Sequence, residues 1–268
     1  MFSLKLWWQA ANLWSRSDAE QYAAALAYFV PFAVIPLLFI SITWVGIIIG
    51  TDEVVALLAG WGAVIDPDIP KLFETSLVTW SDITEQYSVP IAAVLFFSFM
   101  ILVALNSITA GIHKIWGIET RGPRALLQRY FRATLFIVLL QTYIVFIILL
   151  GDTIDGLVSL TGITLITALN PVLFLMSTIL LFALGYGLLP LSAPSFRARL
   201  YGALVAGFLF FGIRSIVSIH FATSPSITLF GAASLVIVLL VWCYVGAGVI
   251  LYGAAFAKVY ENRRLLKK

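Results

Sequence analysis

The stretch LFGAASLVIVLLVWCYVGAGVILYGAAFA, residues 229–257, decides the fold class because it contains no charged side chain. A transmembrane helix needs about 20 consecutive, mainly apolar residues, and this run is long enough. In hydrocarbon every backbone N–H and C=O must be paired within the segment, so the run is expected to be helical. Similar runs precede it at residues 23–50, 89–112, 133–151, 162–189 and 200–221. The sequence therefore predicts an all-α, polytopic membrane protein with six transmembrane helices.

The composition points to the same class of protein. Of the 268 residues, 62% are hydrophobic and 11% are charged, whereas soluble domains contain about 45–50% apolar and about 25% charged residues. The spans follow one another closely, so we interpret residues 1–268 as a single membrane domain. The one cysteine, Cys243, lies in an apolar run. It can form no intrachain disulfide and is expected to be a packing residue.

The charges of the connecting segments predict the orientation. With six spans, both termini lie on one side of the membrane, and fourteen of the sixteen Lys and Arg residues fall on that side. The exceptions are Lys71 and Arg214, and most acidic residues gather on the opposite side, in segment 51–88. Because positively charged loops stay in the cytoplasm, we expect a multi-pass protein of the bacterial cytoplasmic (inner) membrane. Both termini are then cytoplasmic.

Three segments outside the spans have their own character. Residues 1–20 interleave tryptophans with charges and are expected to form an amphipathic segment at the cytoplasmic membrane surface. Residues 51–88 are predicted to form an extracytoplasmic loop with two short helices at the outer face. Residues 258–268 form a basic cytoplasmic tail.

Several stretches together carry a resemblance to a known family. They are AAALAYFVPFAVIPLL at 23–38, HKIWG at 113–117, FALGYGLLP at 182–190, and the last two spans within 201–257. In these stretches the chain resembles the YihY/BrkB family of bacterial inner-membrane proteins, over nearly its whole length. The motifs are structural, so the resemblance implies the fold rather than an activity. It also implies a role in transport or in the cell envelope.

Members of this family were formerly labelled ribonuclease BN, and the residues argue against that activity here. Hydrolysis of RNA needs a metal cluster or an acid–base pair. The two histidines, His113 and His220, are predicted at opposite faces of the membrane, and the cytoplasmic acids lack metal-ligand spacing. The chain also has no P-loop or dinucleotide-binding motif. We therefore expect no enzymatic activity, no cofactor and no nucleic-acid partner.

Arg214 is the only charged residue well inside a predicted span. An arginine near the bilayer centre costs at least ~2.5–3.5 kcal/mol on insertion scales. Its helical face also carries Ser218 and smaller residues suited to helix contact, so we expect Arg214 to point into the bundle. Two interpretations stay open. One is a site for an anionic group such as a lipid phosphate, and the other is a structural arginine that snorkels or bonds backbone carbonyls.

Other candidate residues fall into three groups. Polar residues within spans either line a substrate path or form interhelical hydrogen bonds; they are Asn106, Gln141 and Asn170. Prolines within spans are either helix breaks of the kind found at transporter sites or packing kinks; they are Pro31, Pro36 and Pro171. Cytoplasmic arginines either contact lipid headgroups or only set the orientation; they are Arg121, Arg124, Arg129, Arg132, Arg197 and Arg199.

These observations predict an integral inner-membrane protein that transports or binds a lipid or anionic amphiphile without hydrolysing ATP. The alternative is a non-transporting membrane scaffold or envelope-interaction protein, whose outer loop and partners carry its role. Membrane lipids are the expected partners in both cases. Glycines at helix-packing spacing, such as Gly46 with Gly50, permit a homo-oligomer.

Overall fold

The computed structural model describes residues 4–49, 91–119, 122–161, 169–192, 194–223 and 232–266. These residues form seven helices and no strand, so the all-α class is confirmed over this part of the chain. The helices are α1 (Leu4–Arg16), α2 (Ala19–Ile49), α5 (Ile91–Trp116), α6 (Pro123–Thr161), α7 (Leu169–Leu188), α8 (Phe196–Thr223) and α10 (Ala232–Leu265).

The described helices are consistent with the predicted number of spans. Five of them, α5, α6, α7, α8 and α10, are long and apolar enough to cross a membrane. The remaining long helix, α2, has 31 residues and Glu20 as its only charged side chain, which exceeds the roughly 20 residues that a span needs. The predicted outer-face helices of segment 51–88 lie outside the described residues.

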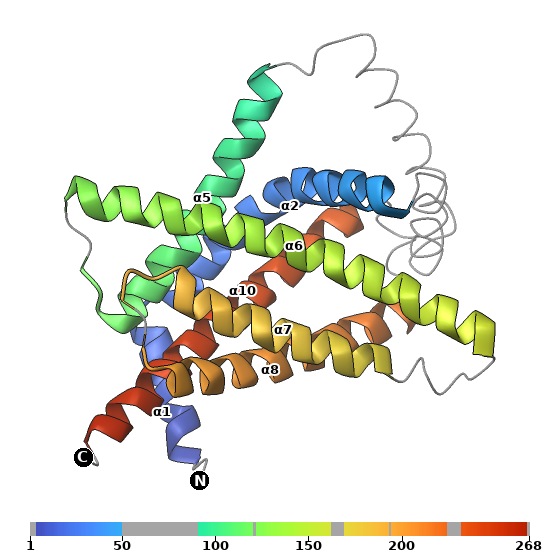
Figure 1. Cartoon of the computed structure of the whole chain (residues 1–268). Coiled ribbons are helices and arrows are strands. Elements are labelled where there is room, and N and C mark those ends of the chain that lie inside the picture. The colour runs from blue at the N-terminus through green and yellow to red at the C-terminus, as the bar shows by residue number, and fades with distance from the viewer. Residues whose placement is uncertain are drawn as a thin grey trace.

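Helix α10 is the centre of the bundle. It packs against α1, α2, α5 and α8, while α7 packs against both α6 and α8. Figure 1 shows the N- and C-termini at the same end of the bundle, as an even number of spans requires. That this end faces the cytoplasm is the prediction from the charges.

Small residues bring α8 and α10 into backbone contact. A Cβ atom placed on Gly202 of α8 would lie 2.5 Å from the carbonyl oxygen of Gly253 and 2.8 Å from Cβ of Ala257, both on α10. Ala203 and Ala254, next along each helix, are fully buried. In lipid, where apolar burial gives little driving force between helices, such close van der Waals packing stabilises association. Gly253 and Ala257 therefore serve close packing of α10 on α8.

The connections at the terminal end of the bundle are shorter than the sequence predicts. The predicted spans at 89–112 and 133–151 leave residues 113–132 as the connection between them, but α5 continues to Trp116 and α6 begins at Pro123. Proline suits the first position of a helix because its missing N–H is unpaired there anyway. At the end of α5, Gly117 adopts φ +67°, and the N–H of Ile118 donates to the carbonyl of His113 at 2.9 Å. This Schellman cap stops the helix without a long loop.

The predicted amphipathic N-terminal segment is a helix, and its apolar face lies on protein. In α1, Leu6 and Ala10 are buried against α10, whereas Trp8 on the other face is exposed. The Tyr252 hydroxyl of α10 also donates to the carbonyl of Trp7 at 3.1 Å. α1 is therefore docked on α10 by packing and by a hydrogen bond.

Candidate functional site

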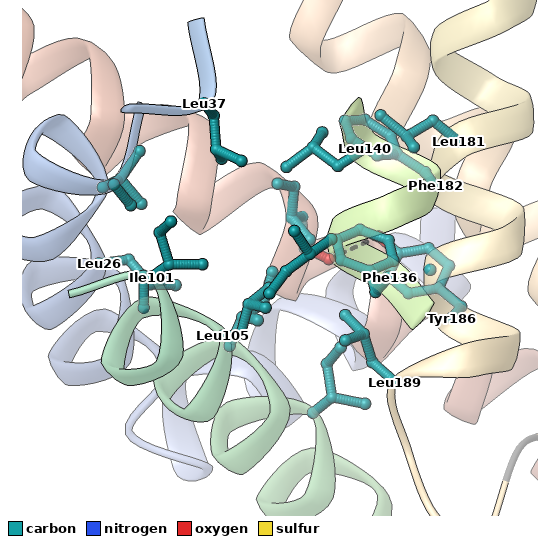
Figure 2. A pocket seen from close by; sticks show the side chains of 18 residues that line it. Leu26, Leu37, Ile101, Leu105, Phe136, Leu140, Leu181, Phe182, Tyr186 and Leu189 are labelled. Carbon is teal, nitrogen blue, oxygen red and sulfur yellow. Dashed lines mark hydrogen bonds between the residues drawn. The ribbon is translucent and has the colours of Figure 1, made fainter. Parts of the chain in front are cut away.

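An apolar cavity of about 210 Å³ lies inside the bundle, between α2, α5, α6, α7 and α10. Figure 2 shows labelled side chains from α2, α5, α6 and α7 facing the same space. Residues that line it include Leu26, Leu37, Ile101, Leu105, Phe136, Leu140, Leu181, Phe182, Tyr186 and Leu189. The volume exceeds the roughly 150 Å³ of an engineered cavity that stays dry and binds benzene or xenon. The cavity is therefore large enough for part of an apolar chain.

The cavity contains almost no polar group. Among the described lining residues, Tyr186 alone has a polar side-chain atom, and its hydroxyl donates to the carbonyl of Ile250 at 2.6 Å. A buried polar group needs such a partner because its desolvation is otherwise costly. With this hydroxyl occupied, the described part of the cavity wall offers only apolar surface to a ligand. Sugars, nucleotides and ions do not suit such a space.

The sequence forms this cavity through helix periodicity and small residues. On α5, the lining residues are Ile101, Ala104, Leu105, Ile108 and Ile112, a spacing that places them on one helix face. Small lining residues on three helices leave the volume unfilled; they are Ala33, Ala104 and Gly185. At Gly185 an added Cβ would lie 3.1 Å from the Phe136 ring. Even one methyl group there would press on the cavity wall.

Basic side chains lie beside the end of the cavity that is lined by Ile112 and Leu189. The next residues in the chain are His113 and the Pro190–Leu191 peptide group. Arg132 of α6 donates to the carbonyl oxygen of Pro190, and the N–H of Leu191 donates to Nε2 of His113 at 3.1 Å. We call His113, Arg129 and Arg132 the basic cluster.

Arg129 joins the cluster one helical turn before Arg132. Its Nη2 donates to the carbonyl oxygen of Asn106 on α5 at 2.7 Å. Both guanidinium groups lie close enough for their charges to act on the His113 ring. In the described part of the chain, neither arginine forms a salt bridge with a carboxylate. The cluster is thus positively charged without an acidic partner from those residues.

Two donors of the basic cluster are buried without an acceptor. His113 is only 4% exposed, and because its Nε2 accepts a hydrogen bond, the ring proton is on Nδ1. Among the described residues, Nδ1 of His113 and Nε of Arg129 have no hydrogen-bond partner. Most buried polar groups in proteins are paired, so these two unpaired donors are unusual.

Comparison with known proteins decides the family. The family model "Virulence factor BrkB" matches residues 11–268. The chain belongs to the BrkB family. The family resemblance found in the sequence is thereby confirmed.

Two relatives of the BrkB-family chain are both called "UPF0761 membrane protein". One, from Alcanivorax borkumensis (strain ATCC 700651 / DSM 11573 / NCIMB 13689 / SK2), is 23% identical over 254 residues, covering 91% of this chain and 57% of that protein. The other, from Glaesserella parasuis serovar 5 (strain SH0165), is 34% identical over 91 residues, covering 34% of this chain and 32% of that protein. The aligned part is therefore less than two thirds of either relative. No solved protein structure matches the chain.

Arg214 does not point into the bundle of this BrkB-family chain, contrary to the expectation from its helix face. Its side chain is exposed, and its guanidinium lies 4.1 Å from the centre of the Phe174 ring on α7. Phe174 is the sixth described residue of α7, so this contact joins α8 to α7. A cation above an aromatic face is stabilised by the ring quadrupole. The cavity is lined by other residues, and Arg214 is not among them.

The polar candidates within the spans have different outcomes. The Gln141 amide forms a hydrogen bond of 2.7 Å with the Ser41 hydroxyl, which joins α6 to α2. Asn106 is exposed, and its backbone carbonyl, rather than its side chain, contacts Arg129. The side chains of Asn170 and Ser218 lie outside what the structure describes. Gln141 thus supports interhelical bonding, the simpler of the two interpretations.

The predicted helix breaks are not breaks in the described helices. α2 continues as one helix through Pro31 and Pro36, in a membrane setting where neighbouring groups can satisfy the freed carbonyls. Pro171 is the third residue of α7, which the structure describes from Leu169. Whether Pro171 interrupts the predicted run at 162–189 depends on residues 162–168, which lie outside the described part of the chain. Pro31 and Pro36 do not interrupt α2.

The candidate headgroup arginines lie in different environments in the structure. Arg129 and Arg132 belong to the basic cluster, whereas Arg124 and Arg197 are exposed. The Arg199 guanidinium lies against Gly187, so closely that a Cβ there would clash with it. Arg121 lies outside the described residues. His113 was not predicted as a site residue, although it contacts the same peptide group as Arg132.

Proposed function

We propose that this BrkB-family membrane protein binds a lipid or another anionic amphiphile, whose apolar chain enters the cavity between α2, α5, α6, α7 and α10. The cavity of about 210 Å³ with apolar walls is the observation that carries the proposal. Ligand pockets are mainly apolar with a few placed polar groups. Here the polar groups lie outside the end walls, in the basic cluster.

The placement of charge supports an amphiphile rather than a purely apolar ligand. The cavity ends at Ile112 and Leu189, and the basic cluster begins at the next residues on α5 and after α7. An amphiphile needs an apolar surface for its chain and, directly beside it, a positively charged surface for its anionic headgroup. Binding needs no nucleotide hydrolysis, and the same site suits a carrier that moves the amphiphile.

The test is the amphiphile that co-purifies with the protein in mild detergent. Leu181→Trp fills the cavity, because Leu181 lines it and is 9% exposed. Leu180→Trp is the matched control, because Leu180 is the neighbouring residue and is 59% exposed on the outer face of the same helix. Lipid mass spectrometry of the extracts is expected to show a bound amphiphile with the wild type and with L180W. It is expected to be lost with L181W.

Folding is checked in the same preparations by size-exclusion chromatography and thermal melting. A well-folded L181W protein that retains the same amphiphile, at the same ratio, would refute the cavity as the binding site. The non-transporting scaffold predicts this result, since a scaffold needs no occupied cavity.

A further inference from the structure

We propose that the basic cluster is a subsite for an oxyanion, a phosphate or a carboxylate, that heads the amphiphile. His113 and Arg129 are assigned as its direct donors. This inference rests on the proposed function for the apolar chain, but its own claim concerns the headgroup and the residues that recognise it.

The first argument is the pair of buried donors. Nδ1–H of His113 and Nε–H of Arg129 have no acceptor among the described residues, and His113 is almost fully buried. A buried donor without a partner is destabilising, so such donors are normally paired. An oxyanion has several lone pairs and can accept from more than one donor at once. It would satisfy both groups.

The second argument is charge. Arg129 and Arg132 both act electrostatically on the His113 ring, and neither has a carboxylate salt-bridge partner within the described ranges. Two like charges near one buried ring raise the local positive potential, which favours an anion nearby. Hydrogen bonds from a guanidinium to an oxyanion are charge-assisted and stronger than neutral ones.

The third argument is that the two ring nitrogens of His113 have different roles. Its Nε2 already accepts from the N–H of Leu191, so the ring is held in place by the turn after α7. The second nitrogen is thereby fixed in orientation and carries the proton. A donor held in advance loses little freedom on binding, which favours affinity. The structural role of one ring nitrogen therefore prepares the binding role of the other.

The experiment compares two probes with the same chain. Full-length protein in phosphatidylcholine nanodiscs is titrated with radiolabelled hexadecyl phosphate and with radiolabelled hexadecanol, and binding to empty nanodiscs is subtracted. The wild type is expected to bind hexadecyl phosphate about tenfold or more tightly, as one or two charge-assisted hydrogen bonds imply. Equal affinities for the two probes would overturn the oxyanion subsite.

Two substitutions at His113 separate its two roles. His113→Gln keeps an acceptor near the position of Nε2 for the N–H of Leu191 but has no donor at the position of Nδ1. His113→Asn keeps a donor near Nδ1 and loses that acceptor. The subsite predicts about tenfold weaker hexadecyl phosphate binding for H113Q and nearly normal binding for H113N. The opposite order would mean that His113 only holds the turn, and would overturn its assignment.

The arginine is tested by Arg129→Gln, with Arg16→Gln as the matched control. Arg16 is exposed in the last turn of α1, and its substitution by glutamine removes the same charge. R129Q is expected to weaken the binding of hexadecyl phosphate about tenfold. R16Q is expected to leave that affinity unchanged. Hexadecanol affinity shows whether the cavity is intact in each variant. Equal losses of hexadecyl phosphate affinity in R129Q and R16Q would overturn the assignment of Arg129 as a direct donor to the oxyanion.

Competition with inorganic phosphate shows whether the anion is soluble or a lipid headgroup. The two probes together show whether the proposed function fails or only this inference. Competition by inorganic phosphate against hexadecyl phosphate but not hexadecanol would support the subsite with a soluble anion as occupant. No competition, together with the preference for hexadecyl phosphate, would support a lipid headgroup. If neither probe binds above empty nanodiscs, the proposed function fails and this inference with it. If both bind equally, only the inference fails.

Discussion

Arg132 and His113 hold the two ends of one peptide group. Arg132 donates to the carbonyl of Pro190, and the N–H on the other side of the same peptide bond, on Leu191, donates to His113. Since C=O and N–H of a trans peptide point in opposite directions, the two side chains approach the turn after α7 from opposite sides. The turn connects α7 to α8, so α5 and α6 together fix where that connection lies.

Arg132→Met is expected to destabilise the protein by about 1–3 kcal/mol, the cost of leaving a buried carbonyl unpaired. Pro190 is fully buried, so water cannot easily replace the arginine. The measurement is unfolding in mixed detergent micelles, followed by circular dichroism. Arg132→Lys keeps a donor and is expected to lose less. A fully stable R132M protein would show that the Pro190 carbonyl does not need Arg132.

Gly202→Leu is expected to prevent the normal packing of α8 on α10, with a loss above about 3 kcal/mol, the upper end for overfilled cores. The nearest atom to its Cβ is a backbone oxygen at 2.5 Å, which cannot move aside. Gly212→Leu on the same helix is the control, because nothing lies within 4 Å of a Cβ there. The readout is the yield of monodisperse protein after detergent extraction. Similar yields for the two variants would contradict the close contact.

The ion pair between Lys114 and Asp18 is expected to contribute little to stability, because exposed ion pairs are weak. The two side chains are 44% and 43% exposed, at the end of α5 and in the turn between α1 and α2. Solvent therefore screens their attraction. A double-mutant cycle with Lys114→Met and Asp18→Asn measures the coupling energy, and added salt should lower it further. A strong coupling that added salt does not reduce would mean that the pair is buried in the membrane-bound protein.

The orientation is tested with single cysteines in a Cys243→Ala background. The two substitutions are Thr153→Cys and Asn262→Cys. Thr153 lies near the C-terminal end of α6, Asn262 lies near the C-terminal end of α10, and both positions are exposed. A maleimide that cannot cross membranes is expected to label T153C in intact cells. It should label N262C only after the membrane is opened. The reverse pattern would place the basic ends outside and contradict the positive-inside assignment.

The sequence predicts the spans well because hydropathy and charge act locally. The run at 229–257 lies almost entirely within α10, and its lack of charges is sufficient to predict a span. The same local signal fails at the start of α6. Arg129 and Arg132 interrupt the apolar run, so residues 123–132 resemble a loop by hydropathy, although arginine favours helix about as well as leucine does.

The candidate site could be predicted only in part. Arg129 and Arg132 were candidates for headgroup contact from their charge and position, with a role in orientation alone as the alternative, and both lie in the basic cluster. His113 gave no such signal, because its partner Leu191 is 78 residues away in the chain. Its position within HKIWG, directly after the apolar residue Ile112, was the available hint. The cavity depends on which helices face one another, and periodicity on a single helix does not contain that information.

The most direct test of the amphiphile account is photo-crosslinking by hexadecyl phosphate with a diazirine at the end of its chain. The protein is irradiated in phosphatidylcholine nanodiscs, and labelled residues are mapped by peptide mass spectrometry. The account predicts labels on the cavity side of α7, at Leu181 and Phe182, and their loss in L181W. Labels confined to the exposed side of α7, at Leu180 and Leu184, would show that the chain stays in the surrounding lipid and would contradict the account.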